Sequence, residues 1–218
     1  MSAREKILGK LRSAPRPFGE LKPIAERRHM IPAQDLSPGE QLQVFIAEAE
    51  AVGCIVYQLD ENSAFEQIME LIGDDRSVLS WDASQMPFAG LHGMLDSLGV
   101  TVAAPDAGDV RVGISGVSAA LAATGSLVLE SGPGRSRSAS LLPDVHIVLM
   151  QKEQITPDLE TWQDAQRAAG YPAFTKASSA TVITGPSKTA DIAHQLVKGA
   201  HGPREVHVMI LGAAPLED

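Results

Sequence analysis

The chain has 218 residues, of which 44% are hydrophobic and 21% charged, and this composition excludes a collagen, a coiled coil and a wholly disordered chain. Eighteen basic against 27 acidic residues give a net charge of −9 at neutral pH, which argues against non-specific nucleic-acid binding. The single cysteine, Cys54, cannot by itself form an internal disulfide, an iron–sulfur site or a thiolate zinc site. Because Cys54 opens an apolar run, we expect it to be a buried structural thiol.

The N-terminal region is basic. Residues 1–30 carry eight Lys or Arg and three Asp or Glu, a net charge of +5, which leaves −14 on the rest of the chain. Such a start on an acidic body indicates either a docking arm or a solvated tail. No apolar stretch approaches the roughly 18 residues that a membrane span needs, and no hydrophobic signal segment is evident. We therefore expect a cytoplasmic protein.

The sequence divides into an arm and a body. Ser2 and Glu5 form a capping box, and Ile7, Leu8 and Leu11 then fall on one helical face. Four prolines follow within residues 13–36, which favours an extended connection. We expect residues 1–36 to be a basic helix with a proline-rich arm that is dispensable for folding, and residues 37–218 to be the body.

In the body, amphipathic helices alternate with strands that are apolar throughout. The expected elements are a helix from Ser37 to Gly53, a strand at 54–59, a helix from Asn62 to Gly73, a strand at 77–81, a helix over 88–98, strands at 100–104, 126–131 and 145–150, a helix from Asp158, a strand at 180–184, a helix over 187–198 and a strand at 206–211. Apolar strands are buried on both faces, so the pattern predicts an α/β fold with a parallel-rich sheet flanked by helices.

Three loops are candidates for a binding site, because ligands of open α/β sheets lie at the carboxyl ends of strands. The first runs over 113–118 and on to Thr124, Gly125 and Ser126. The second covers 131–138 and the third 184–191. The second loop contains Gly132, Gly134, Arg135 and Arg137, and the third contains Gly185, Ser187, Lys188, Thr189 and Asp191.

The second and third loops have the chemistry of an anion site. Ser187 is placed to cap the expected helix over 187–198, whose first-turn amides would bind an anion while Lys188 adds charge. Arg135 and Arg137 would pair with a carboxylate or phosphate. Since both loops follow strands, we expect them to converge on one ligand. The alternatives are a plain helix cap for the third loop and a surface turn for the second.

Several familiar motifs fail. The run from Gly132 lacks the third glycine of a dinucleotide fingerprint, since Arg137 stands there, and Val117 breaks a nucleophile elbow. His194, His201 and His207 lack metal-ligand spacing. His146, in an apolar strand, is either a hydrogen-bonded core histidine or a general base. We therefore expect no metal and no cofactor.

The order of several segments resembles the LUD domain, named for lactate utilisation, and in particular its lactate utilisation protein C branch. The resemblance covers roughly residues 37–214. The segments that carry it are Gly113–Gly116, Ala122–Leu129, Ser140–Ile147, Thr184–Ile192 and Gly199–Pro203 with the trailing Val206–Leu211.

The resemblance implies a NagB/RpiA/CoA-transferase-like α/β sandwich. It also implies a role beside two partners that carry iron–sulfur clusters and together oxidise L-lactate to pyruvate. A chain with one cysteine suits a subunit without clusters. Many family members have an acidic residue where this chain has Ala123, and Glu130 is the nearest acid that could replace it. Glu130 is equally consistent with a solvated strand end.

Three functions remain open. The first is a non-redox subunit or accessory protein of L-lactate oxidation, which binds a small anion or the iron–sulfur partners through the three loops. The second is an independent enzyme acting on an acyl-CoA or sugar-phosphate substrate, with Glu130 or Asp191 as base or nucleophile. A structural scaffold without a small ligand is the third reading, and the sequence leaves open whether the chain is catalytic.

Overall fold

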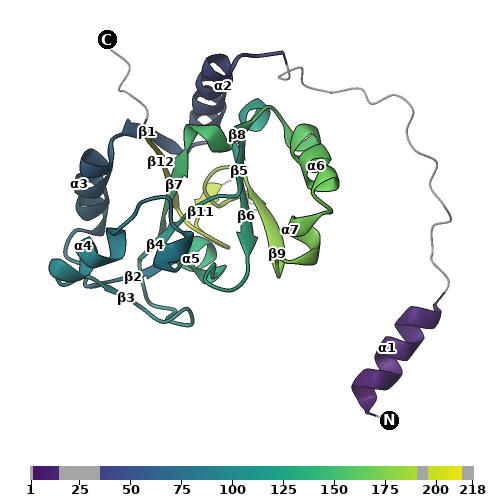
Figure 1. Cartoon of the computed structure of the whole chain (residues 1–218). Coiled ribbons are helices and arrows are strands. Elements are labelled where there is room, and N and C mark those ends of the chain that lie inside the picture. Colours follow the sequence, from purple (N-terminus) through teal and green to yellow (C-terminus); the bar gives the residue numbers. More distant parts are fainter. Residues whose placement is uncertain (1, 15–34, 191–195, 213–218) are drawn as a thin grey trace. The chain divides into compact units, whose positions relative to one another are not determined.

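The computed structural model describes residues 2–14, 35–190 and 196–212 of the chain, which divides into two units, Met1–Met30 and Ile31–Asp218 (Figure 1). In the first unit, helix α1 spans Ala3–Ser13 and begins with the predicted capping box. The Glu5 N–H donates to Ser2 Oγ at 3.2 Å, and the Ser2 N–H donates to Glu5 Oε2 at 2.7 Å. No residue of α1 is buried. The proline-rich residues 15–34 lie outside the described residues.

The second unit is built on a six-stranded sheet in which every neighbouring pair is parallel. Its strands, in spatial order, are β1 (Ile55–Leu59), β12 (Glu205–Leu211), β7 (Val145–Gln151), β4 (Val112–Ser115), β2 (Ser77–Ser80) and β3 (Thr101–Val102). The predicted parallel-rich sheet is therefore confirmed.

Helices flank this sheet, as predicted. Those of the second unit are α2 (Pro38–Ala51), α3 (Glu61–Ile72), α4 (Leu91–Ser97), α5 (Ser138–Leu141), α6 (Leu159–Ala168) and α7 (Pro172–Thr175), with short 3-10 turns η1 (Ala83–Gln85), η2 (Ala122–Thr124) and η3 (Lys152–Gln154). Helix α2 begins at the expected capping box, with Pro38 at its first position. Helix α3 is capped by Asp60, two residues before the expected Asn62.

A second, four-stranded sheet was not expected from the sequence. Its spatial order is β8 (Ile155–Thr156), β5 (Ala119–Leu121), β6 (Ser126–Ser131) and β9 (Ser179–Ile183). Strand β6 is antiparallel to both of its neighbours. Figure 1 shows this sheet, with α6 and α7, on one side of the six-stranded sheet and α3 and α4 on the other.

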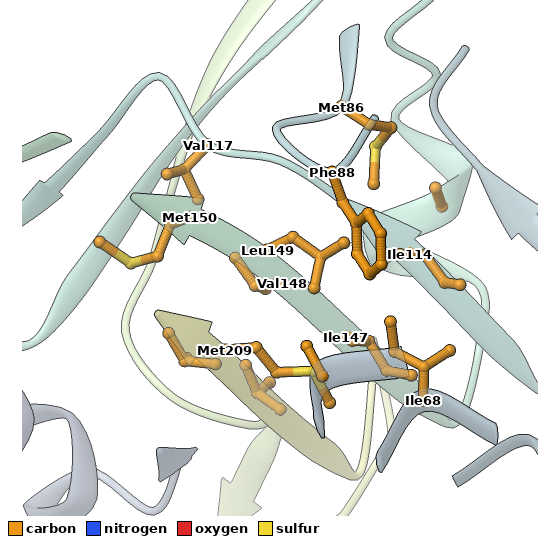
Figure 2. Close-up of a cluster of buried hydrophobic side chains, with 14 of the residues drawn as sticks. Ile68, Met86, Phe88, Ile114, Val117, Ile147, Val148, Leu149, Met150 and Met209 are labelled. Atoms are coloured by element: carbon orange, nitrogen blue, oxygen red, sulfur yellow. The ribbon is translucent and has the colours of Figure 1, made fainter. Parts of the chain in front are cut away.

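The core is aliphatic and centres on β7, whose Val148 and Leu149 are fully or almost fully buried. Figure 2 shows Ile68 of α3 in one cluster of buried side chains with Ile147 and Met209. Burying large aliphatic side chains of this kind stabilises a fold by about 1.5–3 kcal/mol each. The core is therefore stabilised mainly by aliphatic side chains, as the scarcity of aromatic residues requires.

Residues 113–118 were expected to form a loop, and that prediction was wrong for 113–115, while 116–118 do connect β4 to β5 outside regular structure. Val112–Ser115 is strand β4, fully buried between β2 and β7. Glycine is required at position 113 by packing and not by a turn, because a Cβ there would collide with the carbonyl oxygen of Ala139 in α5. Glycine lets α5 approach the sheet closely.

The helix predicted over 187–198 was also wrong. The chain forms β10 (Lys188–Ala190) and β11 (Leu196–Lys198), which pair as an antiparallel hairpin. A helix of that length would separate its ends by about 18 Å. The ends are instead tied together, since the Gly199 N–H donates to the Ser187 carbonyl at 2.9 Å. Tertiary pairing overrides the helical pattern of the sequence.

Candidate functional site

Strand β6 separates the predicted site residues into two groups. It pairs antiparallel with β9, so that Leu127 lies opposite Ile183 near one end and Ser131 lies opposite Ser179 at the other. Thr124, Gly125 and Ser126 therefore lie near the end of β9, where the third loop begins. The arginine loop, residues 131–137, lies near the beginning of β9. The expected convergence of the second and third loops on one ligand is wrong, because they lie at opposite ends of this sheet.

At the start of β6 the hydroxyl groups bond to one another. Thr124 Oγ1 lies 2.7 Å from Ser126 Oγ, which lies 2.8 Å from Thr184 Oγ1. Gly125 has a left-handed φ of 59°, and a Cβ there would collide with the backbone of Glu48 and Ala49 in α2. This group packs the start of β6 against α2.

The third loop also packs on α2. The Lys188 Nζ donates to the carbonyl oxygen of Val52 at 2.6 Å, at the C-terminus of that helix, where a cation is favoured by the helix dipole. Gly185 has φ of 80°, and a Cβ there would lie 2.5 Å from the same oxygen.

Ser187 does not cap a helix. Its N–H donates to the Pro203 carbonyl at 2.8 Å, and its Oγ accepts from the His201 N–H at 3.4 Å. Thr189 lies in β10, and Asp191 lies outside the described residues. The helix N-terminal anion site predicted at Ser187 is therefore absent from this part of the structure.

The arginine loop is held by its own backbone and by the segment after β2. Gly132 and Arg135 form an antiparallel bridge with bonds of 3.1 and 2.9 Å. The Asp82 N–H donates to the Gly134 carbonyl at 2.7 Å, and the buried Trp81 donates its indole N–H to the Ser136 carbonyl at 3.1 Å. These bonds fix the loop without using its side-chain cations.

A pocket of about 380 Å³ opens beside this loop. Its lining combines two guanidiniums with serine hydroxyls: Ser131, Gly132, Arg135, Ser136, Arg137, Ser178 and Ser179. Three of the predicted ligand-binding residues are thus brought together. Ser131 and Ser136 belong to the predicted second loop, although they were not named as ligand-binding residues. Ser178 and Ser179 were missed, because they reach the pocket only through the pairing of β9 with β6, which no local pattern reveals.

The guanidinium of Arg135 is incompletely paired. Its Nη1 lies 3.7 Å from Glu130 Oε2, which is too long for a hydrogen bond. Its Nε is buried without a hydrogen-bond partner among the described residues. The side chain of Glu130 is 13% exposed and that of Arg135 is 28% exposed. Glu130 is therefore a half-buried group behind the pocket, and the alternative of a solvated strand end does not describe it.

A second pocket of about 400 Å³ lies where β1, β7 and β12 end. It is lined by Asp60, Glu61, Pro87, Gln151, Leu211 and Gly212. Its two carboxylates repel an anion. Asp60 already accepts the Ser63 N–H at 2.8 Å, and this bond lowers the pKa of its carboxyl. The carboxyl edge of the parallel sheet is thus acidic, and the basic pocket lies beside the second sheet.

Two buried groups bear on cofactor chemistry. Burial raises the pKa of the Cys54 thiol to about 11, so this side chain is a poor thiolate ligand. His146 is buried in β7, with Nε2 2.8 Å from Ser115 Oγ, which is the predicted hydrogen-bonded core histidine. Within the described ranges, no three His, Cys, Asp or Glu side chains are grouped so that they could hold a metal, and no helix could cross a membrane.

Comparison with known proteins supports the resemblance seen in the sequence. Residues 42–211 match the LUD domain. The chain belongs to the LUD-domain family. This LUD domain is 40% identical to lactate utilization protein C of Bacillus subtilis over 43% of the chain and 39% of that protein. It is 31% identical to lactate utilization protein C of an Exiguobacterium species over 60% of the chain and 51% of that protein.

One relative matches over almost the whole chain. An uncharacterized protein of Neisseria meningitidis is 27% identical to this chain, and the match covers 97% of this chain and 94% of the Neisseria protein. Among solved structures, a DUF162 family protein from Deinococcus radiodurans has a TM-score of 0.57 and 19% identity, covering 81% of this chain and 99% of that one. That likeness confirms the α/β fold alone, and the NagB/RpiA/CoA-transferase-like class stays a prediction.

Proposed function

We propose that this LUD domain protein acts in lactate utilisation, as a non-redox component of the oxidation of L-lactate to pyruvate. The proposal draws on its relatives named lactate utilization protein C. The observation that carries the molecular part is the pocket beside the arginine loop, where Arg135 and Arg137 face serine hydroxyls. Guanidiniums bind carboxylates through charge-assisted hydrogen bonds. The ligand in this proposal is a small anion.

Electron transfer falls to other proteins in this proposal. The chain has one cysteine, and the buried Cys54 has a raised thiol pKa, which disfavours a cluster ligand. Iron–sulfur proteins are therefore the proposed partners, as the family resemblance implies. Affinity purification from the source organism tests this part. Stoichiometric iron–sulfur proteins on the tagged chain support it, and a chain recovered alone from lactate-grown cells contradicts it.

Binding is tested with the full chain by isothermal titration calorimetry, using L-lactate, pyruvate and sulfate as probes. Arg137→Glu reverses a solvent-exposed charge at the pocket and should weaken anion binding by about 10- to 100-fold, the scale of a charge-assisted hydrogen bond. Lys152→Glu, an exposed cation in η3, is the matched control and should bind like the parent. Equal affinity of the Arg137→Glu variant contradicts a site at this pocket.

The biological role is tested by deleting the gene. The deletion strain should grow on pyruvate and fail on L-lactate, and the Arg137→Glu chain should restore growth poorly although it accumulates to the parent level. Undiminished growth of the deletion strain on L-lactate contradicts the proposed role.

The position of Glu130 favours a second candidate function. The mostly buried carboxylate of Glu130 lies beside Arg135 and outside the pocket lining, so this second function requires it to turn towards a bound substrate before it acts as a base or nucleophile. The substrate would then be an acyl-CoA or a sugar phosphate. Turnover of such a substrate by the pure chain, lost in Glu130→Gln, would support it.

A further inference from the structure

We infer that Glu130 sets the charge preference of the arginine pocket, so that the pocket takes a small hydroxylated monocarboxylate in preference to a dianion such as a phosphate ester. This inference rests on the proposed function, because it names the ligand class of the same pocket. Glu130 acts here through Arg135 and does not line the pocket itself.

The net charge at the pocket favours a monoanion. Among the described residues that line the pocket, the charged ones are Arg135 and Arg137. The carboxylate of Glu130 lies 3.7 Å from Arg135 Nη1 and cancels one of these two charges. The net charge of the three side chains is +1. A monoanion neutralises it, whereas a dianion leaves an uncompensated negative charge beside Glu130.

Glu130 and Arg135 are both partly shielded from water. Glu130 is 13% exposed and Arg135 is 28% exposed, so water screens this pair less than it screens surface charges. Asp82, which contacts Gly134, is exposed to solvent and does not line the pocket, so its charge is better screened. Glu130 is therefore the acid whose charge acts most strongly on a ligand held by Arg135.

The uncharged residues of the pocket lining suit a ligand that carries a hydroxyl or keto group. Serine hydroxyls from β6, the arginine loop and the start of β9 both donate and accept hydrogen bonds, which suits a ligand with a hydroxyl or keto group next to its carboxylate. A pocket of about 380 Å³ is at the small end of ligand sites. The Arg135 Nε has no partner in the described structure, which leaves the guanidinium short of acceptors.

The test measures a ratio of affinities. Calorimetry on the full chain gives the dissociation constants of L-lactate, a monoanion, and sulfate, a dianion. The parent should prefer L-lactate. Glu130→Gln removes one negative charge, which favours a dianion twice as strongly as a monoanion, and should shift the ratio towards sulfate by about tenfold. Glu153→Gln, a fully analogous change at an exposed glutamate of η3, should leave the ratio unchanged.

A second variant protects the test against misfolding of Glu130→Gln. Arg137→Gln removes a positive charge from an exposed side chain and should shift the ratio further towards L-lactate, while weakening both ligands. Opposite shifts in the two variants support the inference.

The outcomes separate the inference from the proposed function. If neither probe binds the parent chain, both fail. If both probes bind and Arg137→Glu abolishes binding, but Glu130→Gln and Arg137→Gln leave the ratio unchanged, the pocket stands and the inference is overturned. A parent chain that prefers sulfate also overturns it, and favours the enzyme acting on a phosphate-bearing substrate.

Discussion

At the scale of single residues, His146 shows how the sheet excludes water. Its ring is buried in β7, Nε2 lies 2.8 Å from Ser115 Oγ, and Nδ1 has no hydrogen-bond partner among the described residues. Burial lowers the pKa of His146 from 6.5 to about 3, because the charged ring would lose its hydration. The histidine is therefore neutral in the folded protein at neutral pH.

This burial predicts an acid-dependent loss of stability. Between pH 6.5 and 3 the unfolded chain binds a proton at His146 that the folded chain does not. The free energy of unfolding therefore falls as the pH falls through this window, and the contribution of His146 is fully present above pH 6.5. At pH 5 the loss is on the order of 2 kcal/mol. Urea unfolding at pH 7 and pH 5 checks it. His146→Leu should lose less stability between the two than the parent, and His201→Gln, at an exposed histidine, should lose as much as the parent. An equal loss in all three would refute this account of His146.

At the scale of elements, helix α2 gathers residues that the sequence had assigned to a ligand. Gly125, Gly185 and Lys188 all meet its C-terminal half or its end. Glycines beside a lysine are typical of an anion site. The same residue types also allow a loop to pack closely against a helix. Local patterns cannot distinguish the two uses, since the difference lies in what the folded chain brings alongside.

The contact of Lys188 with α2 gives a stability prediction. Lys188→Met removes the hydrogen bond to the Val52 carbonyl and a cation from the C-terminus of the helix. The expected cost is about 0.5–1 kcal/mol in the free energy of unfolding, measured in urea. Lys152→Met, at an exposed lysine, serves as the control and should cost little. A Lys188→Met variant that is as stable as the parent would show that the capping contact contributes nothing.

How far the sequence predicts elements depends on whether their cause is local. The strands Ser126–Ser131 and Val145–Gln151 follow from the apolar runs at 127–129 and 147–150, and α2 follows from its capping box. The hairpin of β10 and β11 has a distant cause, since Ser187 bonds to Pro203 and Gly199. Strand β4 was missed because Gly113 looks like a turn residue until α5 is placed over it.

At the scale of the whole molecule, the second unit combines a parallel sheet with a mixed one, and the candidate pocket belongs to the mixed sheet. The general tendency of ligands to lie at the carboxyl edge of a parallel sheet predicts one site shared by the three loops. The antiparallel pairing of β6 with β9 divides them. Arg135, Arg137 and Gly132 could be predicted from the second loop, whereas Ser178 and Ser179 of the neighbouring strand could not.

The first unit is expected to be dispensable for folding. Helix α1 buries none of its residues, and the core residues all belong to the second unit. Deletion of residues 1–34 keeps Leu36, whose carbonyl accepts the Gln41 side-chain amide at 2.8 Å, and should leave one cooperative thermal transition with Tm within a few degrees of that of the full chain. Differential scanning calorimetry checks this. A broad or absent transition would mean that α1 completes the core or an interface between chains.

The most direct test of the central claim is a map of backbone amide chemical shifts in the labelled full chain during titration with L-lactate. A ligand in the arginine pocket should shift the amides of Gly132, Arg135, Ser136 and Ser179, which line it, with saturation at one dissociation constant. The amides of Gly185 and Ser187, at the opposite end of the mixed sheet, should stay in place. Shifts confined to Gly185 and Ser187, or no saturable shifts at all, would contradict the claim that this pocket is the anion site.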